Sequence, residues 1–191
     1  MKKLIALVLS LILVLSLAAC GGNRATPTDA PTQAPTEAPT EAPTEASAAY
    51  TGTLTELVTA IYEKQPLEFG VADPIAIDLA DSYQLSYFMG LTDGSKVSEA
   101  VYSEPFIGSQ PYSMVAVRVK DAADASAVAE EMRGGIDTRK WICVEADDLH
   151  VGAYGDVVLL VMVGSELAPG LSEKLMDAFA AVVGSDLDYK N

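Results

Sequence analysis

The chain is poor in the residues that most often carry chemistry. Its 191 residues include two cysteines, one histidine and one tryptophan. A single histidine, His150, gives little support to a histidine metal cluster or a serine triad. The sequence has no Gly-x-Ser-x-Gly stretch, glycine-rich phosphate loop or acidic calcium loop. We therefore expect no enzymatic activity, no metal site and no cofactor, with His150 on the rim of a strand.

Positive charge is also scarce. Twelve Lys and Arg face 27 Asp and Glu, for a formal charge of -15. Such a surface repels the phosphate backbone, which argues against a nucleic-acid partner. The charge suits a domain held off an anionic surface, although plain solubility would explain it equally well. The acidic pairs Glu130-Glu131 and Asp147-Asp148 are expected to be solvated, with weak divalent-cation binding as the alternative.

The two cysteines have different contexts. Leu17-Ala18-Ala19-Cys20 ends an apolar run that starts at Leu4 and follows Lys2 and Lys3. The run is shorter than the roughly 20 residues that span a bilayer, so residues 1–19 read as a secretory signal peptide, with a short membrane anchor as the alternative. Cys143 then has no disulfide partner in the chain, and we expect it to be a buried small hydrophobe rather than a reactive thiol.

The stretch around Cys20 resembles a bacterial lipobox. That resemblance implies a thioether-linked diacylglycerol on Cys20, which would become the first residue of the mature protein. Two acyl chains give stable anchoring where one is marginal. The implied location is the outer face of the cytoplasmic membrane of a Gram-positive bacterium, with the membrane itself as a partner through the lipid.

Residues 20–49 form a linker of Ala, Pro, Thr and acidic residues. Ala-Pro-Thr-(Gln/Glu) occurs four times between Ala30 and Glu45. Proline at every fourth position excludes helix and sheet, and predicts an extended stalk of about 70–80 Å. O-glycosylation of its threonines is suggested by composition alone. We expect a single folded domain from residue 50 to residue 191.

Hydrophobic periodicity outlines that domain. Thr53 and Glu56 form a capping box that begins a helix over residues 53–64. After an ambiguous stretch to Leu91 (a short helix, then an irregular run), Val97–Ser103 and Ser113–Lys120 predict a hairpin whose second strand is covered on one side only.

The second half repeats this order. A helix starting at Asp121 stops at Gly134-Gly135, and a half-exposed strand (149–154) is followed by a buried one (157–163). A last helix covers about residues 168–183. The prediction is an α+β domain, α-ββ-α-ββ-α, with an antiparallel sheet of about four strands and helices mainly on one face.

Aromatic residues near the irregular segments are the best candidates for recognition, because Tyr and Trp are favoured at interfaces. Core filling is the simpler explanation for the same residues. The candidate recognition patch comprises Tyr87, Phe88, Tyr102, Phe106, Tyr112 and Trp141.

The domain also resembles an uncharacterised family of clostridial-type (Firmicutes) lipoproteins that carry a domain of unknown function. The likeness lies in Arg118-Val119-Lys120-Asp121 and Lys140-Trp141, within residues 54–183. It implies the same compartment and a single α+β domain, and names no site residues.

The sequence thus favours a lipid-anchored, extracytoplasmic domain without catalytic activity that binds a protein or an envelope component. A small-ligand or peptide receptor serving a transporter is the alternative. A wall-modifying enzyme that depends on His150 is less well supported, and a Cys143–His150 pair has no support beyond the presence of both residues.

Overall fold

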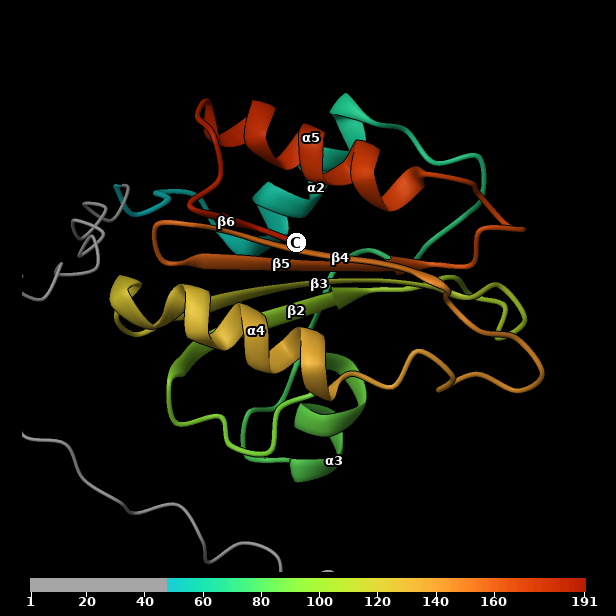
Figure 1. Ribbon diagram of the computed structural model, residues 1–191, viewed down its shortest axis with the longest axis horizontal. Helices are drawn as coiled ribbons and strands as arrows, with labels where there is room; N and C mark the ends of the chain where they lie inside the picture. Colours follow the sequence, from blue (N-terminus) through green and yellow to red (C-terminus); the bar gives the residue numbers. More distant parts are fainter. Residues whose placement is uncertain (1–47) are drawn as a thin grey trace, which may run out of the picture. The chain divides into compact units, whose positions relative to one another are not determined.

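The computed structural model describes residues 48–191, so the predicted signal peptide, Cys20 and nearly all of the linker lie outside the described residues. The domain is α+β, as predicted, and is built on an antiparallel sheet (Figure 1). The sheet has six strands in the order β1-β2-β3-β5-β4-β6, not about four.

Two hairpins form the centre of the sheet, as the alternating residues predicted. In the first, β2 (Val97–Ser103) pairs with β3 (Tyr112–Val119). In the second, β4 (Asp148–Tyr154) pairs with β5 (Val157–Val163) across a turn at Gly155-Asp156. The two hairpins join through β3 and β5. Each end of the sheet therefore gathers loops from both halves of the chain.

Two short edge strands were not predicted. β1 (Ile75–Ala76) pairs with β2, and β6 (Tyr189–Lys190) pairs with β4. A two-residue strand has no period to detect, and each of these exists because a longer strand offers it an edge. They explain why the element order is longer than the predicted one.

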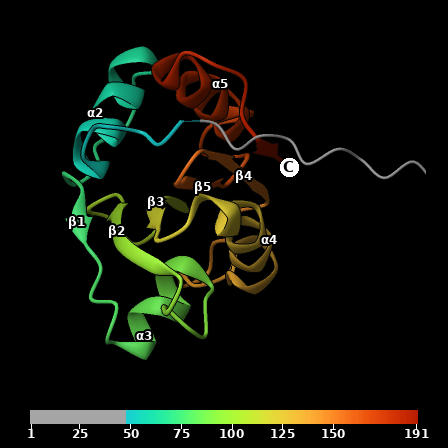
Figure 2. The ribbon, with the colours of Figure 1, turned by 90° about the vertical axis from the view of Figure 1, so that its left-hand side faces the viewer.

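Helices cover both faces of the sheet, which corrects the prediction of one covered face. α2 (Leu54–Lys64) and α5 (Leu171–Val183) lie on one face, and α4 (Ala125–Gly135) and α3 (Ser82–Gln84) lie on the other (Figures 1 and 2). A 3₁₀ turn (Ala122–Asp124) leads into α4, and a π-helix, η1 (Leu85–Met89), continues α3.

β3 shows why the one-face prediction was wrong. Val115, Val117 and Val119 belong to the core under α4, while Met114 and Ala116 belong to the core under α2 and α5. Both sets are buried, so the strand is not half-covered. Likewise β4 was predicted to be half-exposed, yet its Gly152 is buried, because Leu187 and Met176 lie within 3.0 Å of where its Cβ would be.

Several local predictions are confirmed. Thr53 and Glu56 form the capping box of α2: the Thr53 hydroxyl accepts from the Glu56 amide, and the Thr53 amide donates to the Glu56 carboxylate. β5 is buried along its whole length. α5 begins at Leu171, later than predicted, and ends before Gly184, whose φ of 74° suits glycine at a helix C-terminus.

Candidate functional site

The structure separates the six aromatic residues that the sequence grouped as a recognition patch. Tyr87, Phe88 and Tyr102 form a continuous aromatic cluster on the α4 face. The Tyr87 and Phe88 rings meet edge-on with centroids 4.9 Å apart, and the Phe88 ring stacks on Tyr102 at 3.9 Å. Tyr112 is fully buried on the other face, against Phe69. Phe106 is 80% exposed in the β2–β3 loop. The patch as predicted is therefore not one surface.

Lys140, which the sequence did not single out as a site residue, lies at the centre of the part that does assemble. Its ammonium group is 4.5 Å from the ring centre of Tyr87, 5.1 Å from that of Phe88 and 5.3 Å from that of Trp141. Cations are attracted to aromatic faces at this range. Trp141 thus joins Tyr87 and Phe88 through a lysine rather than by direct stacking.

The Lys140 side chain is only 2% exposed, so its charge needs partners. Its Nζ donates to Glu104 Oε1 at 2.6 Å, to the Tyr87 carbonyl at 3.3 Å and to Ser113 Oγ at 3.3 Å. Burial lowers the pKa of Lys140, and the Glu104 carboxylate opposes that shift. This buried ion pair fastens the connector after α4 to the end of β2.

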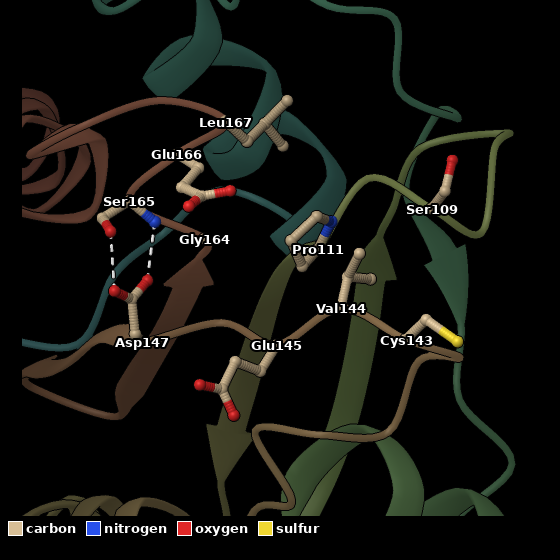
Figure 3. Close-up of a pocket in the computed structure, with 10 residues that line it drawn as sticks. All are labelled: Ser109, Pro111, Cys143, Val144, Glu145, Asp147, Gly164, Ser165, Glu166 and Leu167. Carbon is tan, nitrogen blue, oxygen red and sulfur yellow. Dashed lines mark hydrogen bonds between the residues drawn. The ribbon is translucent and has the colours of Figure 1, made fainter.

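One end of the sheet displays exposed apolar side chains on two loops. Phe106 and Ile107 (59% exposed) lie in the loop between β2 and β3, and Ile142 (85% exposed) lies in the connector between α4 and β4. Ser109 of the first loop and Cys143 of the second line one pocket of about 460 Å³ (Figure 3). We call this end, with residues 104–111, 141–147 and 164–167, the loop end.

The loop-end pocket carries carboxylates and no lysine or arginine among its lining residues. The Asp147 side chain accepts from the amide and the hydroxyl of Ser165, both at 2.6 Å, and these bonds lower the pKa of Asp147 (Figure 3). Glu145 pairs with Arg139 at 2.6 Å. Glu166 lines the pocket as well, so its lining is negatively charged. Asp147 is exposed, as expected, and is also hydrogen-bonded to Ser165.

The remaining lining residues come from three segments, and they are Ser109, Pro111, Cys143, Val144, Gly164 and Leu167. Cys143 is exposed, which contradicts its prediction as a buried hydrophobe. Its φ of 63° is the only positive φ among the non-glycine residues that the structure describes. The adjacent Ile142 is exposed too, so the apolar Trp141–Val144 run marks a surface loop.

His150 lies on β4 at the rim, as predicted, with its side chain 31% exposed. Its Nε2 is 3.3 Å from Asp148 Oδ1. Its Nδ1 and the hydroxyl of Ser172 are the two buried side-chain polar atoms without a hydrogen-bond partner within residues 48–191. Ser172 is fully buried, so its hydroxyl offers no accessible nucleophile to a substrate.

The opposite end of the sheet holds the start of the described chain. The Tyr50 amide donates to Asp156 Oδ1 at 3.0 Å. Arg118 donates to the carbonyl of Tyr50 at 3.0 Å, to that of Gly52 at 2.6 Å and to Asp156 Oδ2 at 2.7 Å. Arg118 and Asp156 form a clamp on the entering chain, and we call this the entry end.

Between residues 48 and 191, no helix is long and apolar enough to cross a membrane, and no group of three or more potential metal ligands gathers. Comparison of the chain with models of protein families, with characterised proteins and with solved structures finds no match.

Proposed function

We propose that the protein is a lipid-anchored binding module on the outer face of the cytoplasmic membrane, without catalytic activity, which recognises a protein partner through its loop end. The observation that carries the proposal is that the two loops that line an acidic pocket also expose Phe106, Ile107 and Ile142. Exposed apolar groups on neighbouring loops are typical of interaction sites.

The position of the loop end relative to the entry end supports the proposal. Tyr50 is held beside Arg118, near the last residue of β3, whereas the pocket residue Pro111 precedes the first residue of the same strand. Seven strand steps separate Pro111 from Arg118, or about 23 Å. If a lipid on Cys20 anchors the chain, the linker joins the domain at the entry end. The loop end then lies at the far end of the sheet from the point of attachment.

Charge indicates the chemistry of the partner. Asp147 and Glu166 line the pocket without a lysine or arginine beside them in its wall. A partner segment that combines a basic side chain with an apolar anchor would complement both parts of the loop end. The chain's formal charge of -15 would also speed encounter with a basic surface.

A small-ligand receptor serving a transporter is the second candidate. The pocket of about 460 Å³ falls within the range of about 300–1,000 Å³ usual for ligand sites. Its acidic lining would select a cationic ligand. The exposed Phe106 and Ile142 outside such a pocket favour the protein partner, because a small ligand would leave them in water.

The test is cross-linking on intact cells that express the full-length protein. We expect one partner to be captured by the wild type, and capture to be lost in Ile142→Asp and Phe106→Asp. Ile75→Asp is the matched control, because Ile75 is 45% exposed but lies on edge strand β1. Cys20→Ser should remove the protein from the membrane fraction. Equal capture by all variants would contradict the loop-end assignment.

A further inference from the structure

A second groove lies on the α4 face, apart from the loop-end pocket. It encloses about 300 Å³ between the α3–η1 segment and the end of α4. It shares no lining residue with the loop-end pocket. Its lining residues are Tyr83, Ser86, Tyr87, Gly135, Asp137, Arg139 and Lys140.

The walls of this groove are held together by direct backbone contact. A Cβ on Gly135 would lie 2.0 Å from the Gly90 carbonyl oxygen, and a Cβ on Gly90 would lie 2.2 Å from the Ile136 nitrogen. Gly90 ends the π-helix with a φ of 69°. π-helical turns are rare and occur often at functional sites. The spacing of the two walls is therefore fixed by glycines rather than by adjustable side chains.

Tyr87, at the base of the groove, is fixed from several sides. Lys140 lies against its ring and also donates to its carbonyl oxygen. Phe88 meets the Tyr87 ring edge-on at 85°, and Tyr83 stacks on it with centroids 5.3 Å apart at 23°. Tyr83 is itself 66% exposed. Its ring thus forms part of an open aromatic platform on a rigid support.

The two cations of the lining already have acidic partners. Arg139 pairs through its Nε with Glu145 at 2.6 Å, and buried Lys140 pairs with Glu104, so the charges around the platform are balanced, which favours a neutral ligand. Asp137 is the single carboxylate of the lining, and it already accepts from the Arg139 amide at 2.9 Å. What remains is the Tyr83 ring with the hydroxyls of Tyr83, Tyr87 and Ser86 and the free acceptor capacity of Asp137.

We propose that this groove binds a neutral oligosaccharide. The C–H face of a pyranose ring is apolar and matches the exposed face of Tyr83, as aromatic platforms bury flat apolar surfaces. The equatorial hydroxyls of the sugar are both donors and acceptors, which matches the hydroxyl groups and carboxylate at the rim. The groove volume lies at the lower end of the usual range for ligand sites, which suits a short stretch of the saccharide.

The experiment measures binding of two neutral hexasaccharides, β-1,4-linked glucose and β-1,4-linked N-acetylglucosamine, to the full-length protein by NMR titration of backbone amides. We expect at least one to shift the amides of residues 83–87 and 135–140. Tyr83→Ala should weaken binding at least tenfold, and Tyr83→Phe, which keeps the ring, less than about threefold. Phe106→Ala is the matched control, because it removes an exposed aromatic ring at the loop end, and should bind like the wild type.

The proposal is overturned if neither saccharide shifts these amides at millimolar concentration, or if Tyr83→Ala binds as well as the wild type. Shifts confined to the loop end would also overturn it. Because Tyr83 is not part of the loop end, failure here leaves the protein-partner proposal standing. Equal capture by all the loop-end variants would contradict the protein-partner proposal and leave the saccharide groove standing.

Discussion

The two faces of the sheet are covered in different ways. On one face, α2 and α5 present regular apolar stripes, and the core beneath them holds aliphatic residues with Phe179 and Tyr112. On the other face, α4 covers one part, and the short α3–η1 segment and the connector after α4 cover the rest. Only this second face contains, among the described residues, a buried lysine.

The contrast between a regular helical cover and an irregular one shows where a fold needs buried polar groups. A regular helix satisfies its own backbone and can offer the sheet apolar side chains alone. An irregular cover leaves backbone groups that need other partners. Lys140 donates a hydrogen bond to one such group, the Tyr87 carbonyl, and the Glu104 carboxylate balances the lysine charge. Polar groups inside the helical face are hydroxyls instead: Tyr62 contacts both Ser103 and Tyr112.

The largest effect should come from the helical face. Phe179 of α5 is fully buried, so Phe179→Ala removes its packing and leaves a cavity. We expect the free energy of unfolding to fall by about 3–5 kcal/mol. Urea unfolding followed by circular dichroism measures it. Phe106→Ala, at an exposed aromatic residue, should change it by less than about 0.5 kcal/mol. Similar losses in the two variants would contradict the burial assignment.

The ion pair of the irregular face should come next. Glu104→Gln leaves the Lys140 ammonium buried without its carboxylate, and should lower the free energy of unfolding by about 3 kcal/mol. Adding Lys140→Met removes the stranded charge, so the double variant should be more stable than Glu104→Gln alone. A double variant that is less stable would show that Lys140 does not depend on Glu104.

Two adjacent glycines then test how tightly the irregular cover is packed. Gly135→Ala should destabilise the protein by about 2–3 kcal/mol, because the new Cβ meets the Gly90 backbone. Gly134→Ala is the matched control in the same helix, with nothing within 4 Å of its Cβ. It should stabilise the protein by about 0.5–1 kcal/mol through helix propensity. Thermal unfolding of the two variants under one buffer separates these opposite signs.

The smallest effects appear at alkaline pH, where Tyr112 and Lys140, which lie on opposite faces of the sheet, should contribute with opposite signs. Burial raises the pKa of Tyr62 and raises the pKa of Tyr112 well above its ordinary value. Above pH 10 the unfolded chain loses phenol protons that the folded chain keeps, so this contribution lowers stability as the pH rises. Burial lowers the pKa of Lys140 in the folded chain. As the pH rises towards 10.5, the folded chain therefore loses this proton before the unfolded chain does, and the contribution of Lys140 raises stability with pH.

Stability against pH, measured for the wild type, Tyr112→Phe and Lys140→Met, isolates these contributions. Relative to the wild type, Tyr112→Phe should lose less stability above pH 10. Lys140→Met should gain less stability as the pH approaches 10.5. Parallel curves for all three proteins would contradict the pKa shifts.

The same contrast explains what the sequence could predict. The capping box of Thr53 and Glu56, the two hairpins and buried β5 follow from local spacing, and the structure contains them. The second covered face was missed because Met114 and Ala116 on β3 suit solvent or a close-packed helix equally well. The local sequence pattern does not distinguish a strand face open to solvent from one covered by a helix.

The candidate site was predicted only in part. Tyr87 and Phe88 are neighbours in the chain and Tyr102 lies on the strand beside them in space, so an aromatic cluster was a reasonable prediction. Lys140 was missed as its centre because its burial depends on Glu104, 36 residues away. Cys143 was misjudged because apolar neighbours usually indicate burial, whereas this run crosses an exposed loop.

The Arg118–Asp156 clamp has a mechanical consequence. A pull on the chain ahead of Tyr50 meets three hydrogen bonds to the carbonyls and the amide of Tyr50 and Gly52 before it reaches α2. Arg118 sits on β3, which is bonded to a strand on each side, so the load passes into the middle of the sheet. If the hydrogen bonds of the clamp break before α2 unfolds, the few residues before Leu54 can extend. Each of them then adds roughly 3.3 Å to the length of the tether. The fold then has a release step that spares its helices and its core.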